Sequence, residues 1–166
     1  MDRDNQQERS ISNRSWLAGI IEGEGSFMLI KNLTFPGRHI AYRPHISVTN
    51  SNAVLIQEYR RALAEEGLPY YIDKPRLVGP YNKRPQVHVV IKGIKRVKRA
   101  IDLLLPYFRG RIGEAQILLE FCRYRLSVPH VQPHGEHEEQ FVETLRYSRE
   151  GNRFELESSE TARLTG

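Results

Sequence analysis

LAGIIEGEG, residues 17–25, is the stretch that decides the fold of this chain of 166 residues. Its apolar side chains recur at helical spacing, and the capping residue types Ser and Asn occur between positions 12 and 15. We therefore predict a short helix there, closed by Gly23 and Gly25. Residues 1–12 are polar and are expected to form an N-terminal arm in front of this helix.

Two features of this stretch go against local helix preferences. Gly19 and Gly23 lie four residues apart on one helical face, although glycine costs about 1 kcal/mol relative to alanine inside a helix. Close contact between two helices through small residues would offset this cost. Glu22 and Glu24 lie at the C-terminal end, where the helix dipole disfavours negative charge by about 0.3–1 kcal/mol each. A carboxylate beside exposed helix-end carbonyls suits a hard cation such as Mg2+; the alternative is two solvated glutamates in a glycine turn.

Hairpins and helices alternate along the rest of the chain. The expected elements are strands 26–33 and 40–49, a helix capped by Asn50 or Ser51 and ended by Gly67, strands 70–78 and 84–92, a helix from 94 that Pro106 stops, helices 113–126 and 136–149, and a polar tail over 151–166. This order predicts an α+β fold with tandem ββα units after the first helix (an αββαββα core). Helices should cover one face of an antiparallel sheet. Residues 13–150 are expected to form a single domain.

Basic residues are concentrated in the middle of the chain. The net charge is +5, from 25 basic and 20 acidic residues. Residues 26–113 hold sixteen basic and five acidic side chains, a net +11, whereas residues 1–25 and 114–166 carry −2 and −4. Nineteen of the basic residues are arginine, whose planar guanidinium suits phosphate and guanine. This distribution favours nucleic acid as the partner, and a solvated basic face is the alternative.

The strands predict a polar sheet face that can read DNA. If Ile46 and Val48 point into the core, their neighbours along the strand point outward, to solvent or to a partner. A twisted antiparallel ribbon can lie in the major groove and read base edges through such side chains. An ordinary polar sheet face is the alternative. The candidate DNA-binding residues on the two hairpins are Asn32, Arg38, Arg43, His45, Ser47, Lys74, Arg76, Arg84, Gln86 and His88.

Residues 17–25 resemble the LAGLIDADG motif of homing endonucleases. The differences from the motif are Ile20 for its second leucine, Glu22 and Glu24 for its aspartates, and Gly23 for its alanine. The order of elements also fits, so the resemblance covers about residues 13–126. It implies a DNA-facing, saddle-shaped antiparallel sheet. It also implies a Mg2+ site, with Mn2+ able to substitute, formed by Glu24 and the Gly23 carbonyl.

Three further residues take roles by this resemblance. Glu22 matches the acid that supports the helix end. Asn50 matches a polar residue that helps hold the attacking water or its metal, and capping of the next helix explains Asn50 equally well. Arg111 matches the basic residue that approaches the scissile phosphate, with Arg109 as a neighbouring candidate; a phosphate contact for affinity only is the alternative. The implied catalytic residues are therefore Glu24, Asn50 and Arg111.

The motif occurs once, so one copy of the chain supplies half of a site. The resemblance implies a homodimer in which the motif helix packs against its twin through Leu17, Ala18, Gly19, Ile20 and Gly23. It also implies an intron-encoded or otherwise mobile homing endonuclease that cuts double-stranded DNA at a long, nearly palindromic site. The alternatives are a non-cleaving binder on the same scaffold, such as an intron RNA maturase or a DNA-binding regulator, and an unrelated basic RNA-binding protein.

Composition excludes several other classes. No apolar run approaches the roughly 18–20 residues that cross a bilayer, and the N-terminus lacks the apolar segment of a secretory signal. We therefore expect no membrane partner and a cytoplasmic location, or an organellar one if an organelle genome encodes the chain. Cys122 is the single cysteine, which excludes an internal disulfide and a Cys-rich zinc site. His130, His134 and His137 leave a histidine-based zinc site as an alternative.

Overall fold

The computed structural model describes residues 3–34, 39–76, 85–129 and 135–164. Its elements confirm the α+β order that the sequence predicts. They are α1 (Arg3–Glu24), β1 (Gly25–Thr34), β2 (His39–Asn50), α2 (Ala53–Glu65), β3 (Tyr71–Arg76), β4 (Gln86–Lys92), α3 (Ile94–Leu104), the short 3-10 helix η1 (Leu105–Tyr107), α4 (Ile112–Ser127) and α5 (Glu136–Leu164). Within these ranges no helix is long and apolar enough to cross a membrane.

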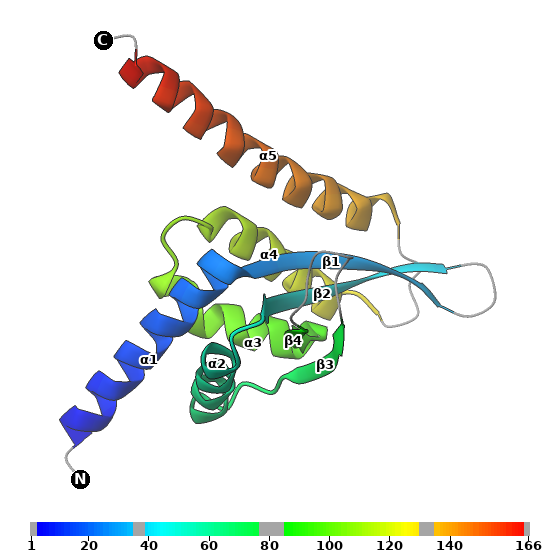
Figure 1. Ribbon diagram of the computed structural model, residues 1–166. Coiled ribbons are helices and arrows are strands. Elements are labelled where there is room, and N and C mark those ends of the chain that lie inside the picture. Colours follow the sequence, from blue (N-terminus) through cyan, green and yellow to red (C-terminus); the bar gives the residue numbers. More distant parts are fainter. Residues whose placement is uncertain (1–2, 35–38, 77–84, 130–134, 165–166) are drawn as a thin grey trace.

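The strands form one antiparallel sheet in the order β1-β2-β4-β3 (Figure 1). Gly25 lies opposite Val48, and Asn50 lies opposite Val87. The start of β1, the end of β2 and the start of β4 therefore meet at one end of the sheet. The helix α1 runs directly into this end, so the motif residues and the last residues of β2 are brought together.

Helices cover one face of the sheet and bury its apolar positions. Phe27, Ile46 and Val48 have no exposed surface and belong to the same buried cluster as side chains of α1, α3 and α4. The helix α3 turns its predicted apolar stripe into this cluster. The buried positions of that stripe are Val97, Ala100, Ile101 and Leu104. Ile46 and Val48 thus point inward as predicted, which leaves the alternate residues of β2 on the other face.

The helix α1 is longer than the sequence predicts. It begins at Arg3, so the expected N-terminal arm is helical. Contacts with the C-terminal end of α2 accompany the extension: Arg9 Nη2 donates to Glu65 Oε1 at 3.3 Å, and Ser10 Oγ donates to Glu66 Oε1 at 3.2 Å. Tertiary contacts of this kind stabilise a helix that local sequence preference alone would leave marginal.

Two other helix ends differ from those expected. The helix α2 is capped by Asn52, whose side chain accepts two main-chain N–H groups of the first turn, and not by Asn50 or Ser51. Gly67 follows α2 with a φ of +62°, the left-handed conformation that the sequence predicts after this helix. The helix α5 continues to Leu164, whereas the sequence predicts a polar tail from residue 151.

Candidate active site

Glu24 and Asn50 lie together at the sheet end that α1 enters. Glu24 is the last residue of α1, Asn50 is the last residue of β2, and the antiparallel register makes them neighbours. Asn50 Nδ2 donates to Glu24 Oε2 at 3.1 Å. Asn50 Oδ1 accepts the main-chain N–H of Asn52 at 2.8 Å, so the segment that starts α2 orients the amide. The structure therefore brings together two of the three residues that the resemblance implies as catalytic, with Glu24 exposed to solvent.

The junction between α1 and β1 depends on Gly25. A Cβ at this position would lie 2.5 Å from the main-chain oxygen of Ile21, a separation that real Cβ atoms do not adopt. The helix passes into the strand without an intervening loop. Glu24 is thus carried by two regular elements, which hold a functional side chain more rigidly than a loop does.

Glu22 binds the start of a neighbouring helix. Its Oε1 accepts the main-chain N–H groups of Arg109, Gly110 and Arg111, each at 2.8 Å. These groups immediately precede α4, and the N-terminal end of a helix favours a negative charge. The unfavourable position of Glu22 at the end of α1 is offset in this way. The geometry is that of a residue supporting the helix end.

The Arg111 side chain is bound within the subunit. Its Nε and Nη2 donate to the two carboxylate oxygens of Glu114, both at 2.7 Å, and its Nη1 donates to the Gly25 carbonyl at 2.7 Å. The hydrogen bond with Glu114 raises the pKa of Arg111. Arg111 therefore fixes the main chain directly after Glu24, and its guanidinium already has a carboxylate partner.

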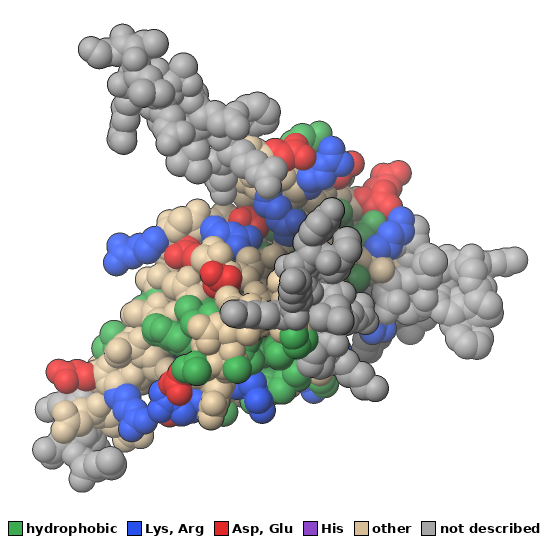
Figure 2. All heavy atoms as spheres, viewed as in Figure 1, with side chains coloured by type: hydrophobic (Ala, Val, Ile, Leu, Met, Phe, Trp, Pro, Cys, Tyr) green, Lys and Arg blue, Asp and Glu red, His purple; other side chains and the backbone are tan. Residues whose placement is uncertain are grey.

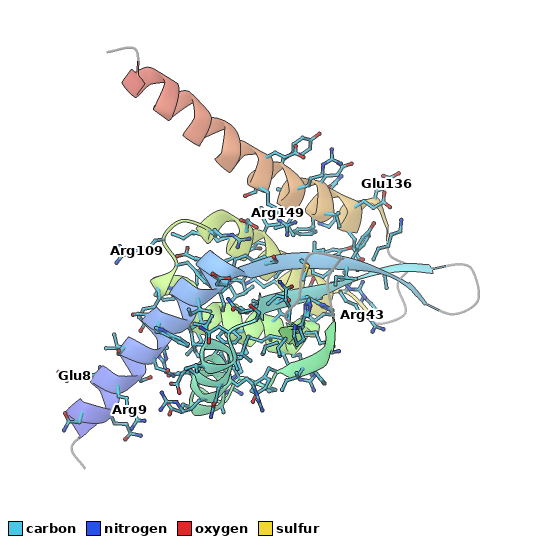
Figure 3. All side chains as sticks on the ribbon, viewed as in Figure 1. Glu8, Arg9, Arg43, Arg109, Glu136 and Arg149 are labelled. Carbon is cyan, nitrogen blue, oxygen red and sulfur yellow. The ribbon has the colours of Figure 1, made fainter. Side chains whose placement is uncertain are left out.

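Glu114 and Arg149 complete this network, and no sequence pattern singled them out. Glu114 is 3% exposed and also accepts a hydrogen bond from Arg149 Nε at 3.2 Å. Burial opposes its ionisation, but hydrogen bonds and charges of the two arginines outweigh burial and hold the pKa of Glu114 below its ordinary value. Arg149 also donates to the Phe27 carbonyl and links α5 to the domain (Figure 3). The i,i+3 spacing of Arg111 and Glu114 is the one sequence signal for this pair.

Arg109 differs from Arg111 in its surroundings. Its side chain is exposed and reaches away from the helices (Figure 3), and it makes no hydrogen bond or ion pair with other described residues. On the face shown in Figure 2, basic side chains are interspersed with acidic ones over several elements. The Arg109 guanidinium is therefore available for an external partner, whereas the Arg111 guanidinium is engaged with Glu114 and the Gly25 carbonyl.

The outward face of the sheet carries the described members of the predicted DNA-binding set. Arg43 and His45 alternate with the buried positions of β2, and Arg43 is exposed. Ser47 follows the same alternation but is buried, with 8% of its surface exposed. The register places Thr49 of this face opposite His88, and Thr49 Oγ1 lies 2.9 Å from His88 Nδ1. His88 is partly exposed, as is Gln86 two residues before it on β4.

The other members of that set are not all described. Arg38 and Arg84 lie outside the described residues. For Asn32 in β1 and for Lys74 and Arg76 in β3 the structure gives the backbone position only. Among the described members, the pKa of His45 is lowered by burial and by nearby positive charges, so its imidazole is neutral near pH 7.

Fewer residues of α1 are exposed for a dimer contact than the sequence predicts. Leu17 and Ala18 have no exposed surface and belong to the core of the subunit, so they have none left for a partner helix. The expected interface is corrected at these two positions, because α1 packs that side against its own domain. Gly19 and Gly23 are exposed, and nothing lies within 4 Å of a Cβ built at either position. Ile20 is partly buried against the core.

The described part of one chain does not by itself form a complete protein cage for a metal ion. It contains no group of three or more His, Cys, Asp or Glu side chains able to hold an ion. Mg2+ usually keeps several waters and binds one or two carboxylates together with substrate phosphates. Exposed Glu24, beside the carbonyls at the end of α1, fits part of such a set. For the zinc alternative, His137 packs against two aromatic rings, and His130 and His134 lie outside the described residues.

Comparison with known proteins gives matches in structure but not in sequence. No family model and no curated protein matches the chain. The archaeal intron-encoded homing endonuclease I-Vdi141I, complexed with DNA, matches with a TM-score of 0.62 and 15% identity, over 84% of this chain and 83% of that chain. The homing endonuclease I-CvuI in complex with its target matches with a TM-score of 0.57 and 14% identity, over 72% and 71%. The LAGLIDADG homing endonuclease I-GzeII in complex with its DNA target matches with a TM-score of 0.57 and 13% identity, over 82% and 43%.

These likenesses define the class of fold, an α+β domain that DNA-bound endonucleases share. The fold is that of the LAGLIDADG homing endonucleases, as the resemblance of residues 17–25 implies. Because the identities are 13–15%, they establish the fold, and the activity has to be argued from the residues of the site.

Proposed function

We propose that the chain is a site-specific endonuclease that hydrolyses double-stranded DNA with a divalent metal ion, as a homodimer. The observation that carries this proposal is the Glu24–Asn50 pair, joined at 3.1 Å and exposed where α1 enters the sheet. An acid at the end of a helix is locally unfavourable. Among the described residues, the start of α4 compensates Glu22, and no helix start donates a hydrogen bond to Glu24. Local preferences are usually violated where function requires it.

The residues of the site take separate roles in this proposal. Glu24 binds the metal, Mg2+ or Mn2+, together with the Gly23 carbonyl. Asn50 orients the Glu24 carboxylate and holds the attacking water. When bound, divalent ions stabilise the attacking and leaving oxygens of the phosphodiester. Arg111 acts as a positioning residue through the Gly25 carbonyl, which it contacts at 2.7 Å, and Arg109 is the better candidate to meet the scissile phosphate.

A homodimer supplies the second half of the site. One chain presents one such carboxylate, and two-fold pairing of α1 through Gly19 and Gly23 brings a second Glu24 beside the first. The chain is matched over 82% of its length by only 43% of I-GzeII, as expected for a single copy of a unit that fills half of a longer protein. A two-fold enzyme reads a nearly palindromic site, with the outward sheet faces of both subunits on the DNA.

Cleavage selection tests the proposal. The purified protein is incubated with Mg2+ and a library of double-stranded DNA that contains intronless forms of candidate insertion sites. Glu24→Gln should abolish cutting and leave binding largely intact, because it removes a metal ligand and no phosphate contact. Glu8→Gln is the matched control, since Glu8 lies exposed near the other end of α1 (Figure 3), and it should cut like the wild type. A tightly bound site that neither Mg2+ nor Mn2+ allows to be cut would instead indicate a binding protein, with intron RNA as the next ligand to test.

A further inference from the structure

Tyr71, Lys92 and Arg96 form a cluster at the end of the sheet opposite to Glu24. The Lys92 ammonium lies 4.4 Å from the centre of the Tyr71 ring, and the Arg96 guanidinium carbon lies 5.3 Å from it. Arg96 Nη1 also donates to the Tyr71 hydroxyl at 2.7 Å. One exposed aromatic ring therefore gathers two cations, one from the end of β4 and one from the first turn of α3.

No carboxylate neutralises these two cations. In the part of the chain that the structure describes, neither Lys92 nor Arg96 forms an ion pair. Arg43 and His45 also line the cleft beside them, and none of the described residues that line it is acidic. Burial first, and then the charges of Lys92 and Arg43, lower the pKa of His45, while Asp73 acts in the opposite sense. The positive charge of the cluster is therefore felt across the cleft.

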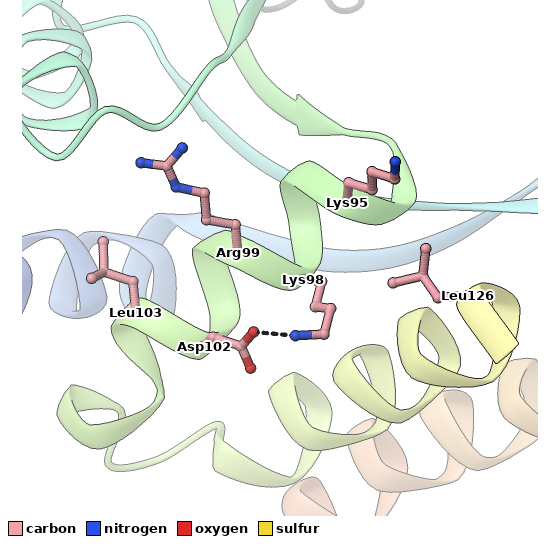
Figure 4. Close-up of a pocket in the computed structure, with 6 residues that line it drawn as sticks. All are labelled: Lys95, Lys98, Arg99, Asp102, Leu103 and Leu126. Carbon is pink, nitrogen blue, oxygen red and sulfur yellow. Dashed lines mark hydrogen bonds and ion pairs between the residues drawn. The ribbon is translucent and has the colours of Figure 1, made fainter.

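A second cleft along α3 shows the opposite arrangement (Figure 4). Lys95, Lys98 and Arg99 line it together with Asp102. Lys98 Nζ lies 2.6 Å from Asp102 Oδ2, so an acid on the same helix pairs with one of the three cations. The two clefts thus differ: Asp102 pairs with Lys98 in one, whereas in the other no carboxylate of the described residues pairs with Lys92 or Arg96. The cleft beside Lys92 and Arg96 is therefore the one whose positive charge an external anion would neutralise.

We propose that Tyr71, Lys92 and Arg96 bind a backbone phosphate of duplex DNA, away from the phosphodiester bond that is hydrolysed near Glu24. This inference rests on the proposed function. A phosphodiester relieves the repulsion between the two converging cations, and arginine and lysine are the usual phosphate-binding side chains. Lys92 lies opposite His45, five residues before the end of β2, which is roughly 17 Å along a strand and about five base steps along the duplex. The contact therefore adds affinity and does not take part in hydrolysis.

Salt-dependent binding tests this assignment. Fluorescent mixed-sequence duplex DNA is titrated at several salt concentrations with three proteins: the wild type, the Lys92→Gln/Arg96→Gln double variant, and the Lys95→Gln/Arg99→Gln double variant. The Lys95→Gln/Arg99→Gln variant removes the same charge from the cleft that contains Asp102. The Lys92/Arg96 variant should bind more weakly and lose about one to two from the slope of log K against log salt, because each lost phosphate contact removes about one. The Lys95/Arg99 variant should keep the wild-type slope.

A third variant separates the cluster from net charge. Tyr71→Leu keeps both cations but removes the ring that gathers them, so it should weaken binding at unchanged charge, with thermal unfolding used to confirm that the variant is folded. Equal slopes for the two double variants would overturn the phosphate site and leave the proposed function standing. If the wild-type protein bound no duplex DNA at any salt concentration, the proposed function itself would be overturned, and the phosphate site with it.

Discussion

The Glu22 carboxylate oxygen Oε1 lies 2.8 Å from the main-chain nitrogen of Arg111 and so joins the C-terminal end of α1 to the N-terminal end of α4. A second link runs in the opposite direction, from Arg111 Nη1 to the Gly25 carbonyl at 2.7 Å. Glu24 lies in the chain between these two anchors. The position of the proposed metal ligand therefore depends on α4 as well as on its own helix.

Glu22→Ala tests the first link. It leaves three N–H groups at the start of α4 without their charged acceptor, and hydrogen bonds to a charged group contribute about 1.5–3 kcal/mol each when buried. Two of the three residues are exposed, so water replaces part of the loss, and we expect a decrease of about 1–3 kcal/mol in the free energy of unfolding. Urea denaturation measures this change. Glu22→Gln keeps an acceptor oxygen and should lose less; equal stability of Glu22→Ala and the wild type would contradict the capping role.

The Arg111–Glu114 pair predicts a specific loss of stability in acid. The folded-state pKa of Glu114 lies below its ordinary value, so its ionised form is stabilised by folding. This contribution is complete above the unfolded-state pKa of about 4.3 and disappears as the pH falls through the lowered folded-state pKa. Glu114→Gln should destabilise the protein by about 3–5 kcal/mol at neutral pH, because it leaves Arg111 without its buried partner.

In acid, the free energy of unfolding of the Glu114→Gln variant should also depend less on pH than that of the wild type. The free energy of unfolding, measured by urea denaturation from neutral pH down to about pH 3, follows both effects. Glu120→Gln is the control on the same helix, since Glu120 is exposed and, among the described residues, pairs with Arg123 three residues away. The control should keep both the stability and the acid dependence of the wild type. A parallel decline of the Glu114→Gln and wild-type proteins in acid would rule out Glu114 as the titrating group.

Gly23 and Gly25 lie two residues apart in the motif, and we expect them to differ in their tolerance of an alanine side chain. Gly25→Ala places a Cβ 2.5 Å from the Ile21 main-chain oxygen, which must displace backbone, and we expect a loss of about 1–3 kcal/mol in stability. Gly23→Ala meets nothing within 4 Å in the subunit and should leave the stability of the separate subunit unchanged or slightly increased. Thermal unfolding of the two variants side by side measures the difference. Equal melting temperatures would show that the junction adapts without cost.

The regular spacing of apolar residues makes most of the fold predictable from the sequence. The alternation in residues 40–49 gives the two faces of β2 correctly, and the stripe of Val97, Ile101 and Leu104 gives the buried face of α3, because both depend on local periodicity. The length of α1 was not predictable in this way. Its first turns are polar and are stabilised by contacts of Arg9 and Ser10 with Glu65 and Glu66, which lie at the end of a helix 56 residues further along the chain. Such contacts leave no local pattern.

The sequence draws attention to the carboxylates of the candidate site, but it does not predict the contacts that support them. Two local conflicts, acids at a helix end and glycines inside the helix, were visible in residues 17–25. The partners that resolve the first conflict for Glu22 are main-chain groups before α4, which have no residue type to recognise. Leu17 and Ala18 were misplaced because apolar residues in a motif helix suit a core as well as an interface, and only the packing of α1 on its own domain decides between them.

The exposed Gly19 predicts where two copies of the chain meet. In the subunit nothing lies within 4 Å of a Cβ at this position, so Gly19→Arg should fold as stably as the wild type. A close helix–helix contact has no room for an arginine side chain, and the variant should therefore be monomeric at concentrations where the wild type is a dimer. Sedimentation equilibrium without DNA measures the association. Ala64→Arg, which adds the same side chain to an exposed position of α2, should remain dimeric. Unchanged dimer affinity in the Gly19→Arg variant would place the interface elsewhere. Pairing of α1 would then not be what brings Glu24 of the two subunits together.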